Sequence, residues 1–283
     1  MSKQQTSIGQ WFVAGVVVLA AIWGGVYIWQ KAVHGGTQES SNTATTSVPV
    51  PAASSSLPAQ PSIQHPIAQA EPASASTAHL PALDNSDSGV AAALAALAGG
   101  NDLTSLLLLD QIIPRIVATI DALPRQSIGS LHILPLHTPK GQFMTEQANG
   151  TTVISEHNAE RYAPYMRIVE SADPKAVVAW YVRFYPLFQQ AYRELGYPKG
   201  YFNDRLVAVI DNMLAAPDLT QPAMLMPSKA VYVYTDPELE SLSVGQKVMI
   251  RVGPANEAVL KAKLRAIRSE LTSQAHTAAG SPH

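Results

Sequence analysis

The residues best suited to chemistry lie at the end of the stretch "YPLFQQAYRELGYPKGYFNDRL", Tyr185 to Leu206. A glycosidase needs two carboxyl groups held roughly 5 to 9 Å apart. Asp204 and Asp211 share one face of the helix expected to begin near Asn203, and Arg205 lies one step round. The same residues also suit a helix start, with Asn203 as the N-cap and Asp204 in the first turn. This capping role is favoured over a catalytic one.

The tyrosines before this cluster are the second candidate. Tyr181, Tyr185 and Tyr192 recur on one stripe of the helix expected to begin at Asp173. A row of tyrosines can line a groove for sugar or peptide, whereas a helix that is apolar around most of its circumference is usually central core. Core packing is favoured, and the groove remains the alternative. The candidate binding residues are Tyr181, Tyr185, Tyr192, Tyr197, Tyr201, Asn203, Asp204 and Arg205.

Other chemistry finds no support in the sequence. The chain has no cysteine, which removes disulfides, thiolate catalysis and cysteine-based metal sites. His132 and His137 are five apart on an expected strand, so they point to opposite faces, and no HExxH spacing occurs. The motifs GxxxxGK[ST], GxGxxG, GxSxG and SxxK are also absent. We therefore predict no metal and no cofactor.

Charge is confined to one part of the chain. All but four of the charged residues lie between Pro81 and Leu271, which hold 17 basic and 19 acidic side chains. Such a balance creates no field that would attract nucleic acid. This span is predicted to be a single globular domain, at 81–272, followed by a disordered tail at 273–283.

Within that domain the patterns are mainly helical. Asp84 to Asp87 precede an Ala-rich helix, and "LTSLLLLDQIIPRIVATIDAL" predicts a second helix that Pro114 bends. Further helix starts are expected at Asp173-Pro174, Asp236-Pro237, the Ser243/Gln246 capping box and Gly253-Pro254. The last helix has an apolar stripe of Leu260, Leu264, Ile267 and Leu271 and a basic stripe of Lys261, Arg265 and Arg268, which is expected to face solvent.

The β signals are confined to residues 124–155. The run "LHILPL" favours a strand, and Asn149-Gly150 between two alternating runs predicts a hairpin. We therefore expect a mainly α (α+β) fold, in which a compact multi-helix domain carries a small β-hairpin or sheet insert.

The N-terminal part predicts a membrane anchor. Residues 8–29, "IGQWFVAGVVVLAAIWGGVYIW", are 22 uncharged residues, which as a helix match a bilayer core of roughly 30 Å. No cleavage site follows closely, so residues 1–34 are predicted to be a stub and an uncleaved single-pass helix. Lys3 and Lys31 nearly balance, and the short stub favours a cytoplasmic N-terminus. The domain is then expected in the periplasm, anchored in the inner membrane.

Residues 35–80 predict a disordered tether. They contain six prolines and no aromatic residue, and half of them are Ser, Thr or Ala. Such a segment cannot bury enough apolar area to offset its ordering entropy. As a random coil it would span on the order of 35 to 40 Å.

The globular region resembles a bacterial family known as domain of unknown function 3014. The resemblance rests on "YPLFQQAYRELGYPKGYFNDRL", "DPELESLSVGQK", "GPANEAVLKAKLR" and "LPALDNSD", and it covers Leu80 to Leu271. It implies a single-pass anchor, a low-complexity tether and one domain in a Gram-negative envelope. It supplies no catalytic residue.

Two functions fit these observations. The first is a tethered periplasmic module without catalytic activity, which binds an envelope protein or cell-wall glycan. The second is a periplasmic hydrolase of cell-wall material that uses a carboxylate pair including Asp204. The two differ in whether Asp204 shares an open cleft with a second carboxylate.

Overall fold

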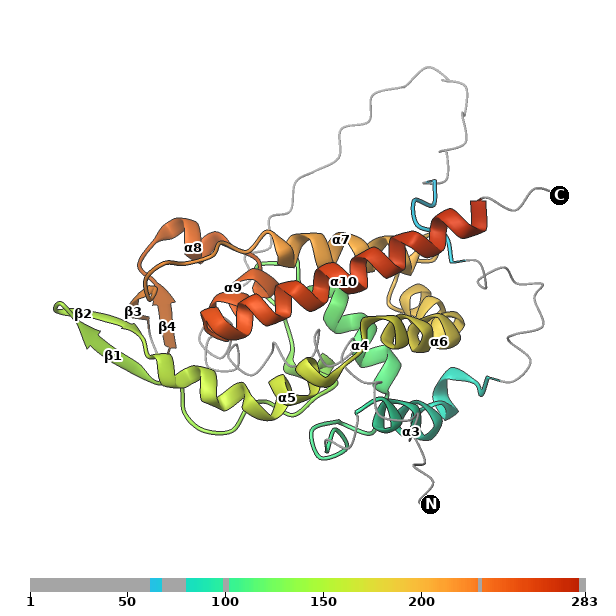
Figure 1. Cartoon of the computed structure of the whole chain (residues 1–283), viewed down its shortest axis with the longest axis horizontal. Coiled ribbons are helices and arrows are strands. Elements are labelled where there is room, and N and C mark those ends of the chain that lie inside the picture. The colour runs from blue at the N-terminus through green and yellow to red at the C-terminus, as the bar shows by residue number, and fades with distance from the viewer. Residues whose placement is uncertain (1–61, 68–79, 99–101, 229–230, 280–283) are drawn as a thin grey trace, which may run out of the picture.

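The computed structural model describes residues 62–67, 80–98, 102–228 and 231–279, and side chains as far as Ser273. Helices dominate these residues, and a small antiparallel sheet accompanies them, which confirms the mainly helical α+β class (Figure 1). The helices are α3 Asp87–Leu97, α4 Ile112–Ala122, α5 Ala163–Ser171, α6 Pro174–Glu194, α7 Phe202–Leu214, α8 Pro237–Ser241, α9 Val244–Arg251 and α10 Pro254–Ala279. The strands are β1 Thr145–Ala148, β2 Thr151–Ile154, β3 Met224–Ser228 and β4 Val231–Tyr234.

The core lies where four helices meet. Helix α6 packs against α4 and α10, and α7 packs against α10 and α4. Helix α10 runs across this bundle from the end that carries the sheet toward the opposite end (Figure 1). The predicted apolar stripe of α10 is buried along its whole length, and most of α6 is buried as well. Since apolar area removed from water is the main stabilising contribution, this bundle sets the frame for every other element.

The predicted helix starts at 173, 236 and 243 are confirmed with their caps. Asp173 accepts from Lys175 N at 3.2 Å, and Asp236 accepts from Glu238 N at 2.8 Å. Ser243 and Gln246 form both bonds of the capping box. Each side chain satisfies an amide that has no partner inside the helix.

The predicted hairpin is confirmed and belongs to a larger sheet. Strands β1 and β2 are joined by Asn149 and Gly150, whose φ angles of 51° and 78° are those that a two-residue hairpin turn requires. The sheet continues in the order β1-β2-β3-β4. Strands β3 and β4 were not predicted, because Pro227 interrupts a run that is already short. Leu225 and Tyr234 anchor them on a second small core.

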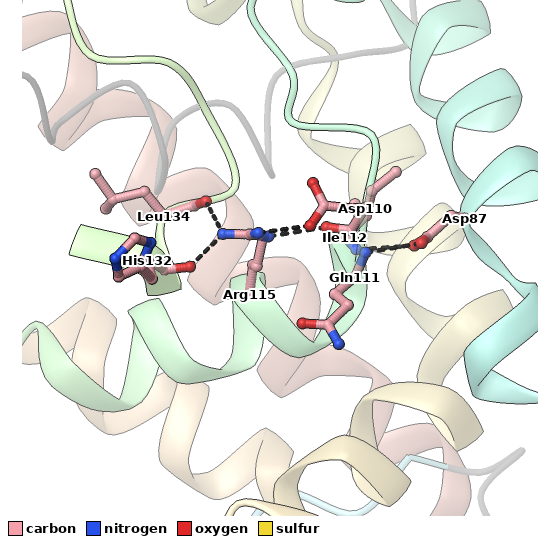
Figure 2. A network of polar contacts seen from close by, with 7 residues as sticks. All are labelled: Asp87, Asp110, Gln111, Ile112, Arg115, His132 and Leu134. Atoms are coloured by element: carbon pink, nitrogen blue, oxygen red, sulfur yellow. Dashed lines mark hydrogen bonds and ion pairs between the residues drawn. The ribbon is translucent and has the colours of Figure 1, made fainter. Parts of the chain in front are cut away.

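Helix α4 is shorter than predicted. It begins at Ile112, after Gln111 in the left-handed conformation, so the expected long helix with a bend at Pro114 is wrong. The two oxygens of Asp87 accept from Gln111 N at 2.7 Å and Ile112 N at 2.8 Å (Figure 2). Pro114 then lies in the first turn, where an amide has no helical partner to lose. A side chain on α3, distant in sequence, therefore sets the start of α4.

The predicted strand "LHILPL" is also wrong, since residues 131–133 form a short 3-10 helix. Arg115 on α4 donates to the carbonyl oxygens of His132 and Leu134, in addition to Asp110 (Figure 2). The carbonyl oxygens of His132 and Leu134 thus bond a side chain of α4 rather than a neighbouring strand. One isolated bridge, between Leu107 and Leu136, is all the pairing that forms there.

Two of the predicted segments, the tether and the C-terminal tail, include residues that the structure describes. Residues 62–67, inside the predicted tether, lie on the domain as the short blue segment of Figure 1, and α10 continues past residue 272 to Ala279. The predicted membrane helix at 8–29 lies outside the described residues. Among the residues that are described, no helix combines the length and the apolar character needed to cross a bilayer.

Candidate functional site

The three tyrosines of the predicted stripe on α6 belong to the main core. Tyr181, Tyr185 and Tyr192 are 5%, 1% and 6% exposed. Their rings pack edge-on or tilted against neighbours such as Phe188 and Phe202. Burial raises the pKa of Tyr181 and Tyr185 well above the ordinary value of a phenol. The favoured core interpretation therefore describes these side chains, and none of them lines an open groove.

Gln189 links this buried aromatic face to the start of α7. Its Oε1 accepts from the Tyr185 hydroxyl at 2.9 Å and from Phe202 N at 2.9 Å, and its Nε2 donates to Gly200 O at 2.8 Å. Gly200 is required here, because a Cβ atom would lie 2.7 Å from the ring of Tyr192. The turn between α6 and α7 is therefore fixed from inside the core.

The start of α7 holds a peptide from elsewhere in the chain. Asp204 accepts from Gln64 N at 3.0 Å and from His65 N at 2.7 Å, one bond to each carboxylate oxygen. Asn203 donates from Nδ2 to His65 O at 2.9 Å. The Tyr201 hydroxyl accepts from Ile67 N at 2.7 Å. Three of the predicted site residues thus meet at one place, around the main chain of residues 64–67, which we call the docked segment.

This arrangement corrects the predicted cap. The N-cap of α7 is Tyr201, not Asn203, and the Tyr201 side chain makes no capping bond; the first amide of the helix, Phe202 N, is bonded by Gln189 instead. Asn203 lies one residue inside the helix and is fully buried. Asp204 is in the first turn as expected, but its carboxylate binds amides of the docked segment.

The remaining two candidates form a separate cluster around a buried carboxylate. Arg205 donates to Asp121 through Nε at 3.0 Å, and the Tyr197 hydroxyl donates to the same side chain at 3.2 Å. Arg125 completes the group as an ion pair with Asp121. Asp121 is 2% exposed, so this cluster is a structural tie between α4 and α7.

No carboxylate pair of the predicted kind forms. Asp211, the proposed companion of Asp204, pairs with Arg268 of α10, whose Nη2 lies 3.0 Å from it. Asp204 faces the docked segment instead. The two carboxylates therefore have different partners.

A cleft lies elsewhere, at the junction of the sheet and the helical body. Its volume is about 440 Å³, which falls in the range of small-molecule sites. Four stretches of chain line it: residues 154–159, residues 219–223, the end of α9 and the start of α10. Its lining includes Ile154, Asn158, Leu219, Ala223, Ile250, Arg251, Ala255 and Glu257. The sequence offered no signal for this cleft, because its residues come from separate elements with no shared motif.

Three polar side chains of the cleft contact neighbouring groups of the domain. Asn158 accepts from Met144 N through Oδ1 at 3.0 Å and donates to Met144 O through Nδ2 at 2.6 Å. Arg251 lies over the ring of Tyr234, 5.6 Å from its centroid. Glu257 forms an ion pair with Lys261 at 2.9 Å. Burial raises the pKa of Glu257, although the ammonium of Lys261 opposes this shift.

The environment of Lys261 differs from the prediction. It was expected on a solvated basic stripe, but it is 3% exposed. Its ammonium donates to Ala216 O at 2.6 Å and to Asp218 at 2.7 Å in addition to the ion pair. Three oxygens around one ammonium compensate for its loss of water.

Metal ligands do not cluster in the part of the chain that is described. No group of three or more His, Asp or Glu side chains there is placed to hold a metal ion. Of the described histidines, His157 pairs with Glu160 at 3.1 Å.

Comparison with known proteins gives one finding. A family model described as "Protein of unknown function (DUF3014)" matches residues 112–268, more than half of the chain. The match includes α4, the sheet, α6, α7 and most of α10, and it confirms the resemblance seen in the sequence. No curated protein and no solved structure gives a significant match.

Proposed function

The chain belongs to the DUF3014 family of proteins of unknown function, and from its geometry we propose that it is a binding module without catalytic activity. Its partner binds in the cleft between the sheet and the helical body. The observation that carries this proposal is a cleft of about 440 Å³ whose two buried ionisable side chains, Arg251 and Glu257, are already held by neighbouring groups. Such a cleft offers mainly shape and apolar surface.

The hydrolase alternative has weaker support. Acid–base catalysis needs two carboxyl groups that can reach the substrate and exchange protons. Asp204 accepts two main-chain amides, and Glu257 is paired with Lys261. Each of the two is therefore already committed to a bonding partner.

A protein partner fits the cleft better than a glycan does. Sugar sites commonly use aromatic rings as platforms, and none of the residues that line the cleft is aromatic. The sheet beside it exposes Met224 and Met226 instead, and Met144 directly before β1 is exposed as well, so that the three are between 38% and 49% exposed. Methionine adapts to irregular apolar surfaces and is common where one site accepts a flexible partner segment.

The location of the module is proposed from the sequence. The apolar stretch at 8–29 would anchor it in the inner membrane with a cytoplasmic N-terminus, and the tether at 35–80 would give the domain its reach into the periplasm. The partner would then be an envelope protein within that reach.

The test is site-specific photocrosslinking of the full-length anchored protein in its own envelope. A photoreactive side chain replaces Ala255, which lies on the first turn of α10 and lines the cleft. The matched control places it at Ala258, which is exposed on the same helix and does not line the cleft. We expect a discrete protein adduct from position 255 and none from 258.

Two outcomes would contradict the proposal. Identical adducts from both positions would show contact without use of the cleft. If lysozyme digestion reduced the adduct at position 255 to a glycan fragment, the ligand of the cleft would be cell-wall material.

A further inference from the structure

The start of α7 recognises the main chain of a peptide. Its four hydrogen bonds to the docked segment all end on backbone atoms, namely Gln64 N, His65 N, His65 O and Ile67 N. A carboxylate with one bond to each of two successive amides is a charge-assisted arrangement, and the chain bends at Gln64 and His65, where these two amides lie. Recognition of this kind depends on backbone shape more than on side-chain identity.

The docked segment matches this pattern at every position. Between Gln64 and Ile67 each amide that exists is bonded, and the one position without an N–H is Pro66. Ile67 supplies the single apolar anchor, since it is 3% exposed and belongs to the main core, whereas Ile63 is 54% exposed. The site therefore takes a short bent peptide in which a proline is followed by an aliphatic residue.

The fit is incomplete in a way that favours exchange. Asn203 is fully buried, yet among the described residues its Oδ1 has no hydrogen-bond partner. The buried hydroxyl of Tyr181 also has no hydrogen-bond partner among the described residues, and it interacts electrostatically with Tyr201 and Asp204. Buried polar atoms without partners weaken a bound state, because they lost their water without a replacement. Within the docked segment, only the side chain of Ile67 is buried in the main core to offset this loss.

We propose that the start of α7 is a peptide-binding site and that its ligand is the chain's own segment 64–67, which docks and releases reversibly. The site shares no residue with the cleft. In the docked state, residues 35–61 alone separate the predicted anchor from the domain. On release, the whole of residues 35–80 is available, so the reach of the domain increases. Docking thus sets the distance at which the cleft operates.

The first test is hydrogen exchange on the intact full-length protein. We expect residues 62–67 to exchange more slowly than a free peptide but at least about tenfold faster than the core amides of α4 and α6. Asp204→Asn should accelerate exchange in 62–67 alone, since the amide group binds the two backbone amides poorly. Protection of 62–67 equal to that of α4 would make the segment a permanent part of the fold and overturn the proposal.

The second test offers the ligand in trans. In the full-length chain, residues 62–67 are replaced by glycine and serine, and a labelled synthetic peptide with the sequence of residues 60–69 is added. We expect this chain to bind the peptide at least about tenfold more tightly than the wild-type chain, in which the segment competes at high effective concentration. Thermal unfolding of the replaced chain checks that it is folded.

Substitutions then locate the binding. Asp204→Ala should weaken peptide binding about 10- to 100-fold, because two charge-assisted hydrogen bonds are lost. Asp211→Ala is the matched control on the same helix and should leave binding unchanged, since Asp211 pairs with Arg268. Peptide binding that ignores Asp204→Ala, or none by a folded replaced chain, would refute the site. A wild-type dimer that Asp204→Ala dissolves would assign the ligand to a second copy and overturn docking within one chain.

Discussion

The start of α7 and the cleft beside the sheet satisfy their polar groups in opposite ways. At α7, Asn203 and Asp204 bond to a segment more than 130 residues away in the chain. In the cleft, Asn158 and Glu257 bond to the walls that carry them. Side chains directed outward define a site for a specific backbone. Where the side chains bond to their own walls, the shape and the apolar lining of the cavity determine which ligand binds.

The same contrast extends to rigidity. Gln189 and the packed tyrosines of α6 hold the α7 start from inside the main core, whereas the cleft is bounded by the smaller core around Leu225 and Tyr234. Perturbations of the first region should therefore affect the whole fold, and perturbations of the second should act more locally. Three predictions test this difference, in order of decreasing effect.

The largest effect should come from high pH. Burial is the main cause that raises the pKa of six tyrosines. The pKa of Tyr165 is raised to about 12, and the pKa values of Tyr162, Tyr181, Tyr185, Tyr192 and Tyr234 are raised as well. A group whose folded pKa exceeds its unfolded value of about 10 stabilises fully below that value, and this stabilisation is lost as the pH rises through the folded pKa. We expect cooperative unfolding from above about pH 10.

Parallel records of phenolate absorbance and far-UV circular dichroism check this prediction. The phenolate signal that Tyr181→Phe removes should arise together with the loss of helix. Tyr232→Phe, at a tyrosine that is 36% exposed, is the control. If the Tyr181 signal arose while the helices remained intact, the α6 stripe would be open to solvent and the groove interpretation would return.

The next effect concerns the link between α6 and α7. Gln189→Ala removes three hydrogen bonds and leaves Phe202 N and the Tyr185 hydroxyl without their partner inside the core. Each buried group so abandoned costs about 1 to 3 kcal/mol, so we expect a loss of about 3 kcal/mol in the free energy of unfolding. Urea denaturation measures it. Gln190→Ala, whose side chain is exposed and bonds only Glu194, should lose less than about 0.5 kcal/mol.

How far the sequence predicts this molecule depends on the range of the interaction. Local chemistry was sufficient for the caps at Asp173, Asp236 and Ser243 and for the Asn149-Gly150 turn. The start of α4 was mistaken, because Asp87 on another helix sets it. A side chain that binds a distant amide leaves no periodic trace in the sequence.

The candidate site was predicted in part for the same reason. Tyr201, Asn203 and Asp204 were identified from their composition and position, and they do converge. Their partner could not be predicted, because residues 64–67 lie in a stretch whose composition indicates a tether. The cleft left no signal at all, since four separate stretches of chain build it.

The smallest predicted effect lies at the wall of the cleft. Lys261→Met removes the ammonium that compensates the buried carboxylate of Glu257 and the carbonyl of Ala216. Removing one partner of a buried pair can cost 3 to 5 kcal/mol, but Glu257 can take up a proton because burial already raises its pKa. We therefore expect a loss of about 2 kcal/mol at neutral pH, and a smaller loss at lower pH, where the carboxyl group is neutral.

The double variant separates the pair from its surroundings. With Glu257→Met added, no uncompensated charge remains, and most of the lost stability should return, as a double-mutant cycle by urea denaturation would measure. Arg265→Met, an exposed cation one turn further along α10, is the control and should change stability by less than about 0.5 kcal/mol. A loss on Lys261→Met as large as that on Gln189→Ala would mean that the wall of the cleft is as integral to the fold as the α6 core, and the contrast between the two regions would fail.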